Sequence, residues 1–253
     1  MNSLANYTCV LIGILLCGLS LKAEKSPDYS DYKQLLRTYV EADGVRYAAW
    51  AADADDRAAL EAFVEHLGQV DVDVLAEDEQ VAFYINLYNA SMVKIVLANY
   101  PLASVKTIGI LPFSVFKKDQ ITLGDYKVSL DDIEKGILLS KYFDPRLHFA
   151  VNCASKSCPP LRAEPFTGDK LEKQLQEQTE LFAGSERAAQ INEETGSIAY
   201  SELFKWYVDD FEVENPAEYL NKYRSEALPA NYSVKWISYD WSLNEIKEET
   251  KEE

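Results

Sequence analysis

The spacing of apolar and polar residues predicts a chain built mainly of separate helices. Apolar residues recur at helical spacing in segments bounded by capping residues, Gly or Pro. These segments predict helices over residues 28–42, 55–67, 77–99, 130–140, 168–184, 201–211 and 216–224. Ser129 and Asn215 stand where N-caps are expected, and Pro216 takes a first helical position. The segment at 77–99 is apolar almost all the way round, so we expect it to be buried.

Short stretches between these segments predict strands, some of them paired. Two hairpins are expected, Ile121–Leu123 with Tyr126–Val128 and Ala189–Asn192 with Ser197–Tyr200, because turn residues separate the members of each pair. Further strands are predicted at His148–Cys153 and Val234–Ser238. Hairpins beside separate helices, without a regular βαβ alternation, predict a single α+β domain in which several helices pack on a small mixed or antiparallel sheet.

The two ends of the chain differ in composition from the middle. The apolar run Val10–Leu21 is 12 residues long, which suits the apolar region of a signal peptide and is too short to span a membrane. We therefore expect a signal peptide at 1–23, a globular domain at 24–243 and an acidic flexible tail at 244–253. The protein would be exported, to the periplasm or the extracellular side of the cell envelope. The alternative is an uncleaved N-terminal anchor.

The charge balance narrows the set of partners. The 253 residues include 25 basic and 42 acidic side chains, a formal net charge of −17. Nucleic-acid binding depends on Lys and Arg that displace counterions, so we expect no nucleic-acid partner. The same argument predicts no strong membrane binding after signal cleavage. We expect an unidentified small molecule or peptide as the ligand, and no cofactor.

The reactive residues of the domain gather in one segment, DPRLHFAVNCASKSCPPLR, from Asp144 to Arg162. A thiol nucleophile needs a partner that lowers its pKa or accepts its proton, and His148 is the best-placed imidazole. In a strand His148 and Cys153 point to opposite faces, so we expect Cys158, beyond a polar turn, to reach His148. Cys158 is then the candidate nucleophile and His148 the base, with Cys153, Asn152 and Arg162 as further candidates.

Two other interpretations of these cysteines remain open. Two cysteines five positions apart in an exported chain are typical of a small disulfide loop, so a structural Cys153–Cys158 disulfide is the main alternative. His148 would then be a hydrogen-bonded core residue. Inert buried thiols are the second alternative. His148, Cys153 and Cys158 lack the tightly paired spacing of structural zinc ligands, so we expect no metal site.

The predicted buried helix contains two amides on one face. Asn86 and Asn89 are three residues apart, and a buried amide without a partner costs about 1–3 kcal/mol. One hypothesis is that they orient His148 or donate to a substrate oxyanion. The alternative is that they bond the backbone of a neighbouring loop, which is the commoner arrangement for buried amides.

Four motifs, taken together and in this order, resemble a known family. They are AFYINLYNA at 82–90, YPLASVKTIG at 100–109, HFAVNCASKSCPPLR at 148–162 and LFKWYVDDF at 203–211. They resemble the family called domain of unknown function 547, over a region from about Asp28 to about Tyr223. The resemblance implies a single exported or membrane-associated α+β domain without a settled activity. It also implies signature residues, which correspond here to Asn86, Asn89, His148, Cys153, Cys158 and Pro159.

Two functional hypotheses follow from these residues. In the first, the chain is a thiol-dependent hydrolase or transferase, or a thiol-redox protein, of the cell envelope. Cys158 would be the nucleophile or a redox partner of Cys153, with His148 as base and Asn89 or Asn86 as the orienting amide. In the second, the chain is a non-catalytic binding or structural module of the envelope, held by a Cys153–Cys158 disulfide.

Overall fold

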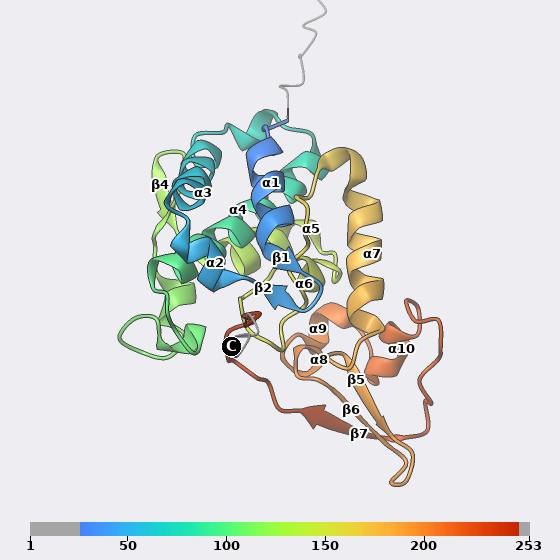
Figure 1. Cartoon of the computed structure of the whole chain (residues 1–253). Helices are drawn as coiled ribbons and strands as arrows, with labels where there is room; N and C mark the ends of the chain where they lie inside the picture. Colours follow the sequence, from blue (N-terminus) through green and yellow to red (C-terminus); the bar gives the residue numbers. More distant parts are fainter. Residues whose placement is uncertain (1–25, 248–253) are drawn as a thin grey trace, which may run out of the picture.

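The computed structural model describes residues 26–247, and these form an α+β domain (Figure 1). The α+β class predicted from the sequence is confirmed. The predicted signal peptide at 1–23 lies outside the described residues, as do residues 248–253.

The N-terminal part is helical and surrounds one long helix. Its elements are α1 (Ser30–Tyr39), β1 (Val40–Glu41), β2 (Gly44–Val45), α2 (Tyr47–Ala52), α3 (Ala54–Leu67), η1 (Val72–Val74) and α4 (Glu77–Ala98). Helix α3 begins where the Asp53 side chain accepts hydrogen bonds from the amides of Asp55 and Asp56. The predicted helices at 55–67 and 77–99 are confirmed within a residue. The one predicted at 28–42 ends early, because Val40 pairs with Val45 in a short antiparallel ladder.

The middle of the chain contains the first of the two predicted hairpins and the helices around it. Its elements are η2 (Val105–Thr107), η3 (Ser114–Lys117), β3 (Ile121–Leu123), β4 (Tyr126–Val128), η4 (Asp132–Leu139, a π-helix), α5 (Ser140–Tyr142), α6 (Leu147–Ala150), η5 (Gly168–Lys170) and α7 (Leu171–Ala183). The hairpin β3–β4 has the predicted bounds. Ser129 and Asp132 bond each other's backbone amides, so the predicted cap at Ser129 is confirmed.

The strand predicted at His148–Cys153 is wrong. Leu147–Ala150 form the single helical turn α6, and all four of its residues are buried. The amide of His148 donates to the carbonyl of Pro145, which belongs to a turn rather than to a sheet ladder. The apolar run is too short for its pattern to distinguish a buried strand from a buried helical turn. Leu147 packs in one hydrophobic core and Phe149 in the other, and this packing on two sides favours the turn.

The C-terminal part carries a mixed three-stranded sheet and short helices. Its elements are β5 (Ala189–Asn192), β6 (Ser197–Ser201), α8 (Leu203–Trp206), α9 (Val208–Phe211), α10 (Pro216–Leu220) and β7 (Ser233–Ile237). Strand β6 pairs antiparallel with β5 and parallel with β7. Asn215 caps α10 as predicted. The helix predicted at 201–211 is interrupted at Tyr207, whose backbone leaves the helical region and whose side chain turns toward Glu134.

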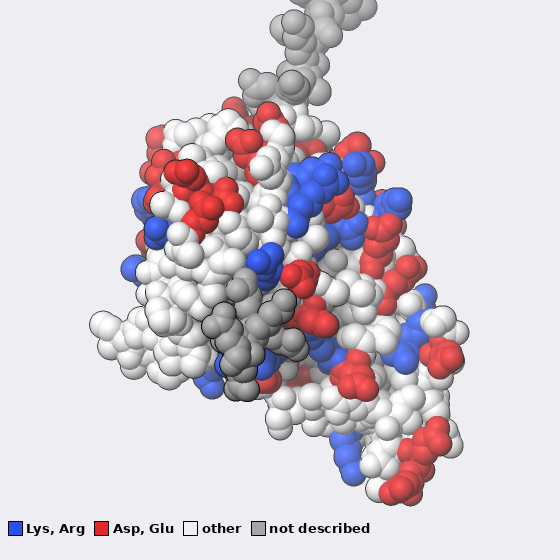
Figure 2. Space-filling model, viewed as in Figure 1, with Lys and Arg blue, Asp and Glu red and all other residues white. Residues whose placement is uncertain are grey.

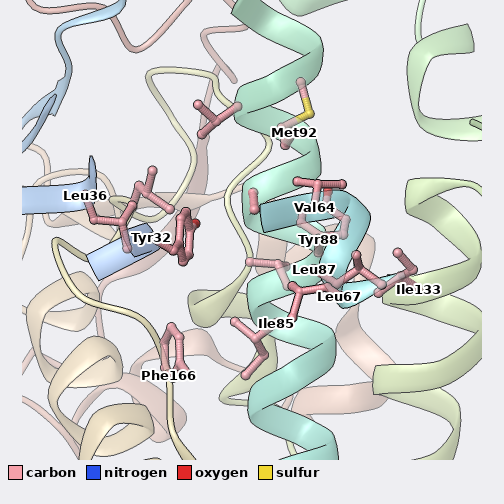
Figure 3. Packing of buried hydrophobic residues seen from close by; sticks show 14 of the residues in the cluster. Tyr32, Leu36, Val64, Leu67, Ile85, Leu87, Tyr88, Met92, Ile133 and Phe166 are labelled. Carbon is pink, nitrogen blue, oxygen red and sulfur yellow. The ribbon is translucent and has the colours of Figure 1, made fainter. Parts of the chain in front are cut away.

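Helix α4 is the centre of the main hydrophobic core. Figure 3 shows four of its side chains, Ile85, Leu87, Tyr88 and Met92, among residues from other elements: Tyr32, Leu36, Val64, Leu67, Ile133 and Phe166. The helix is long and apolar enough to cross a membrane, but 83% of its apolar window is buried inside the protein, as in a core helix. A second, aromatic cluster under the C-terminal part includes Phe149 of α6, so α6 joins the two cores.

The end of the described chain returns to the helical part. Leu243 pairs with Ser155, and Glu245 pairs with Val45 in an isolated bridge. The carbonyl of Asn244 accepts a hydrogen bond of 2.9 Å from the amide of Val45. Residues 244–247, which belong to the tail predicted at 244–253, are therefore packed against the domain.

Candidate functional site

A cavity of about 460 Å³ opens between the helical and the C-terminal parts. Its wall includes four of the residues singled out from the sequence, His148, Cys153, Cys158 and Pro159. Segments distant in sequence complete it, namely α4, residues 113–117, η4, α8 with the turn that follows it, and the side chains of Tyr239 and Trp241. This cavity is the candidate functional site.

A tight loop over residues 152–159 places both cysteines in the wall. The Asn152 side chain closes this loop, because its amide nitrogen donates to the Pro159 carbonyl at 2.7 Å and its oxygen accepts from the Ala154 amide at 2.9 Å. Ala154 has a left-handed backbone with φ of 61°, which is unfavourable for a residue with a Cβ. The turn brings the Cys153 amide to 3.0 Å from Cys158 Sγ.

Cys153 and Cys158 are both free thiols in the structure. The Cys153–Cys158 disulfide expected as an alternative is therefore not formed here. The amide-to-sulfur hydrogen bond nevertheless shows that the loop holds the two residues against each other. The two thiols also differ in exposure, since Cys153 is half-buried and Cys158 is buried.

Cys153 is the thiol with the lower pKa. Burial raises its pKa, but hydrogen bonds from Cys158, Ser155 and Tyr239 outweigh that effect and lower the pKa to about 7. The Ser155 hydroxyl lies 3.0 Å and the Tyr239 hydroxyl 3.4 Å from Cys153 Sγ. Hydrogen bonds to a thiolate stabilise the charged form, so a larger fraction of Cys153 than of an ordinary cysteine is ionised near neutral pH.

Cys158 behaves in the opposite way. Burial raises its pKa well above the ordinary value, and the hydrogen bond with Cys153 and the charge on that residue raise it further. Its Sγ also lies 3.9 Å from the carbonyl oxygen of Val151, a second acceptor within reach. The sequence favoured Cys158 as the nucleophile, whereas the structure makes Cys153 the more acidic thiol.

His148 is held by an acid from another segment. Its Nε2 lies 2.7 Å from Oδ2 of Asp210, and the Tyr207 ring packs 4.1 Å from its centroid. Burial lowers the pKa of His148, and the carboxylate of Asp210 opposes this shift. Among residues 26–247, no hydrogen bond joins His148 to the sulfur of Cys153 or Cys158. The expected contact between His148 and Cys158 is therefore not made through a hydrogen bond.

A carboxyl group with a raised pKa faces the same cavity. Glu134 lies on η4, and its Oε1 accepts a hydrogen bond of 3.0 Å from the Tyr207 hydroxyl. Burial raises the pKa of Glu134, while the charge on Lys135 and the hydrogen bonds from the hydroxyls of Tyr207 and Tyr88 oppose the rise. The cavity therefore contains a carboxyl group that holds its proton to higher pH than an exposed glutamate.

The two asparagines of α4 bond the backbone of neighbouring loops. Asn89 donates to the Ala150 carbonyl at 2.9 Å and accepts from the Asn152 amide at 2.8 Å. Asn86 makes the same pair of bonds with the carbonyl and amide of Phe166, at 2.7 and 3.0 Å. The alternative of loop-bonding amides is thus confirmed for both, and Asn89 fixes the start of the cysteine loop.

The arginines near the cysteine segment form ion pairs outside the wall of the cavity. Arg162 lies 2.7 Å from Glu164 and 2.6 Å from Glu177. Arg146 pairs with Asp144 and Glu172. Neither arginine lines the cavity, so the structure does not bring Arg162 to the thiols.

Several residues of the site were missed from the sequence. Glu134 lies in an amphipathic segment and Asp210 stands next to another acid, Asp209, so neither differs in sequence from an ordinary surface acid. Tyr239 follows the strand predicted at Val234–Ser238 and carries no motif. Within the described residues, no three His, Cys, Asp or Glu side chains gather closely enough to hold a metal ion.

Comparison with known proteins gives one match, to a family model. Residues 72–183 match the family described as "Protein of unknown function, DUF547". The matched region includes α4 with its two asparagines and the whole cysteine loop, and it ends before Asp210 and Tyr239. No curated protein and no solved structure matches the chain. The match to residues 72–183 supports the DUF547 family that the sequence motifs resemble.

Proposed function

We propose that the cavity is a site of thiol–disulfide exchange in which Cys153 is the attacking thiol and Cys158 the second thiol. The observation that supports the proposal is that two free thiols in one short loop differ in both exposure and pKa. Cys153 is half-buried with a pKa lowered to about 7, and Cys158 is buried with a raised pKa. A thiol with a pKa near ambient pH is the most effective attacking group, and a protected second thiol can complete the exchange.

The reaction requires only a disulfide as co-reactant. The Cys153 thiolate attacks one sulfur of a substrate disulfide, forms a mixed disulfide and releases the other substrate sulfur as a thiolate. Cys158 then gives its proton to the released substrate thiolate, attacks Cys153 Sγ and expels the second substrate sulfur, which takes up the proton that Cys153 had released to solvent. The substrate disulfide is reduced to two thiols, and the protein is oxidised by two electrons to the Cys153–Cys158 disulfide.

The surrounding residues suit a small or peptide-like disulfide. Trp206, Tyr239 and Trp241 give the cavity aromatic walls, which bury apolar groups of a ligand. Glu134, with its raised pKa, is a proton donor available to a leaving thiolate. His148 and Asp210 fix Tyr207 against the cavity rather than activating a sulfur directly. We expect no nucleic-acid substrate, because the chain carries a net charge of −17.

The compartment that we propose is the cell envelope. The apolar run at 10–21 supports export, and disulfides form and persist in exported proteins. A thiol-dependent hydrolase or transferase would need a base in contact with the attacking sulfur. His148 bonds Asp210 instead of a thiol, so this arrangement supports thiol–disulfide exchange better. A non-catalytic module with a permanent Cys153–Cys158 disulfide is the other outcome that the following test separates.

The test uses the position of Lys156 between the two cysteines. Trypsin cleavage after Lys156 places Cys153 in LHFAVNCASK and Cys158 in SCPPLR, so mass spectrometry measures the alkylation of each thiol separately. We use the full chain with Cys9→Ser and Cys17→Ser, fully reduced beforehand. At pH 7 we expect Cys153 to be about half ionised, against about 3% for an ordinary cysteine, and to alkylate first.

Trapping variants then test the exchange itself. Incubated with an aromatic disulfide, Cys158→Ser is expected to retain one substrate thiol on Cys153, whereas Cys153→Ser retains little. The chain with both cysteines is expected to release the substrate thiols and to lose two hydrogen masses. Thiols that alkylate slowly and equally, or a Cys158→Ser variant that traps nothing, would contradict the proposal. A disulfide that persists in reducing buffer would favour the structural module.

A further inference from the structure

Residues 105–118, which include η2, η3 and the loop between them, form a lobe with an apolar tip. Ile110 is 99% exposed, more than any other large apolar side chain of the described residues, and Leu111 is 68% exposed. Figure 1 shows the segment in green as a loop that stands out from the body of the domain, and Figure 2 shows the corresponding lobe almost entirely white. Two large aliphatic side chains at a protruding tip are exposed to water at a cost in free energy, so their exposure calls for an explanation.

The loop holds this tip in a defined conformation. Gly109 has φ of 97°, and a Cβ at this position would collide with the Ser114 side chain. The Ser114 amide donates to the Leu111 carbonyl at 3.1 Å, which closes the turn. Phe113 packs edge-on against Trp241 with ring centroids 4.7 Å apart. The outward direction of Ile110 and Leu111 is therefore built into the local backbone.

The same segment is positively charged in an acidic protein. Residues 105–118, VKTIGILPFSVFKK, contain Lys106, Lys117 and Lys118 and no acid, whereas the whole chain carries −17. Lys106 Nζ lies 5.1 Å from the Phe113 ring centroid, so this charge sits beside the apolar tip. Charges beyond about 8 Å are largely screened at physiological ionic strength, so the local charge determines what this lobe attracts. Asp119 follows directly, and residues 105–119, with three lysines and one acid, still carry a net charge of +2.

We propose that the lobe formed by residues 105–118 docks onto an anionic lipid bilayer, with Ile110 and Leu111 inserted at the interface. Two exposed aliphatic side chains in a segment that contains three lysines match the apolar interior and the anionic headgroups of a bilayer. A protein partner would require about 800 Å² of complementary surface on this side, and a convex tip with two aliphatic side chains offers much less. The lipid surface is therefore the partner that the charge and shape favour.

Docking would bring the cavity close to the bilayer. Phe113, Phe116 and Lys117 belong to the lobe and also line the cavity, so its opening lies next to the docked tip. The proposal does not depend on thiol exchange, since it rests on the exposure, conformation and charge of the lobe alone. It revises the expectation of no strong membrane binding, which was drawn from net charge without knowledge of where the lysines lie.

The test places a reporter at the tip. Residues 10–21 can also bind lipid, so the measurement is local: tryptophan fluorescence of Leu111→Trp in the full chain, as a difference from the unsubstituted chain. The matched control is Val74→Trp, at an apolar position that is 42% exposed outside the lobe. The vesicles contain phosphatidylcholine with about one-third phosphatidylglycerol, with or without brominated acyl chains.

We expect the Leu111→Trp emission to shift to the blue and to be quenched by brominated chains, while Val74→Trp shows neither change. Replacing Lys106, Lys117 and Lys118 by Gln is expected to abolish the dependence on phosphatidylglycerol and on salt. Quenching of Leu111→Trp no stronger than that of Val74→Trp would overturn the proposal. So would a blue shift that grows with protein concentration in the absence of vesicles, because it would identify a second copy of the chain as the partner.

Discussion

Removal of the Tyr239 hydroxyl tests the physical basis of the site. In the structure this hydroxyl lies 3.4 Å from Cys153 Sγ and 3.2 Å from the Ser155 hydroxyl, which is itself 3.0 Å from the same sulfur. Both hydroxyls stabilise the thiolate by hydrogen bonding. Tyr239→Phe keeps the ring in the wall of the cavity and deletes only the donor, so the change acts on the pKa of Cys153 with little loss of packing.

The size of the effect follows from the strength of the lost bond. A hydrogen bond to a charged group contributes about 1.5–3 kcal/mol, and a pKa unit corresponds to about 1.4 kcal/mol. Taking the low end for a long contact to sulfur, we expect the pKa of Cys153 to rise from about 7 to about 8. The thiolate fraction at pH 7 then falls from about one half to about one tenth, and the alkylation rate falls about fivefold.

The assay is the rate of alkylation of Cys153 by iodoacetamide between pH 5 and pH 10, followed in the tryptic peptide that contains it. Tyr239→Phe should shift the midpoint of the profile upward by about one unit, with the two rates converging above about pH 9.5. Tyr126→Phe, at a position 76% exposed, is the control and should leave the profile unchanged. An unshifted midpoint in Tyr239→Phe would refute the assignment of Cys153 as a hydrogen-bonded thiolate.

Two further variants test the framework of the cavity. Asn89→Ala should lower the free energy of unfolding by about 2–4 kcal/mol, because the buried Ala150 carbonyl and Asn152 amide both lose their partner. Asn99 is the control, because its side-chain amide donates to a carbonyl of the adjoining helix, and Asn99→Ala should lower the free energy of unfolding by less than about 1 kcal/mol. Urea titrations under reducing conditions measure both variants, and equal losses of unfolding free energy would contradict the role of Asn89. The pKa of Glu134 is higher in the folded than in the unfolded protein. Its contribution to the free energy of unfolding is therefore complete below the unfolded pKa of about 4.3, and it is lost as the pH rises through the pKa of the folded protein. Glu134→Gln should therefore gain stability relative to the natural chain in thermal unfolding as the pH rises above about 4, and a difference independent of pH would count against a carboxyl with a raised pKa.

Local sequence signals determined much of the secondary structure. The bounds of α3 and α4 follow from periodic apolar residues, from the Asp53 cap and from Pro101 beyond the end of α4. The two hairpins follow from turn residues between short apolar strands. These features depend on interactions within a few residues, and such interactions are encoded directly in the order of the side chains. The sequence also identified the segment that carries the reactive groups of the cavity.

Tertiary structure alone decided which of those groups are chemically distinct. The sequence paired His148 with Cys158, because it assumed a strand where packing between two cores forms a helical turn. It could not show that Cys153 has the lowered pKa, since the Tyr239 hydroxyl that stabilises its thiolate lies 86 residues away in the chain. It also could not show that three lysines and two aliphatic residues form an exposed lobe beside the cavity. Charge stabilisation and exposure depend on neighbours in space, and only the folded chain brings those neighbours together.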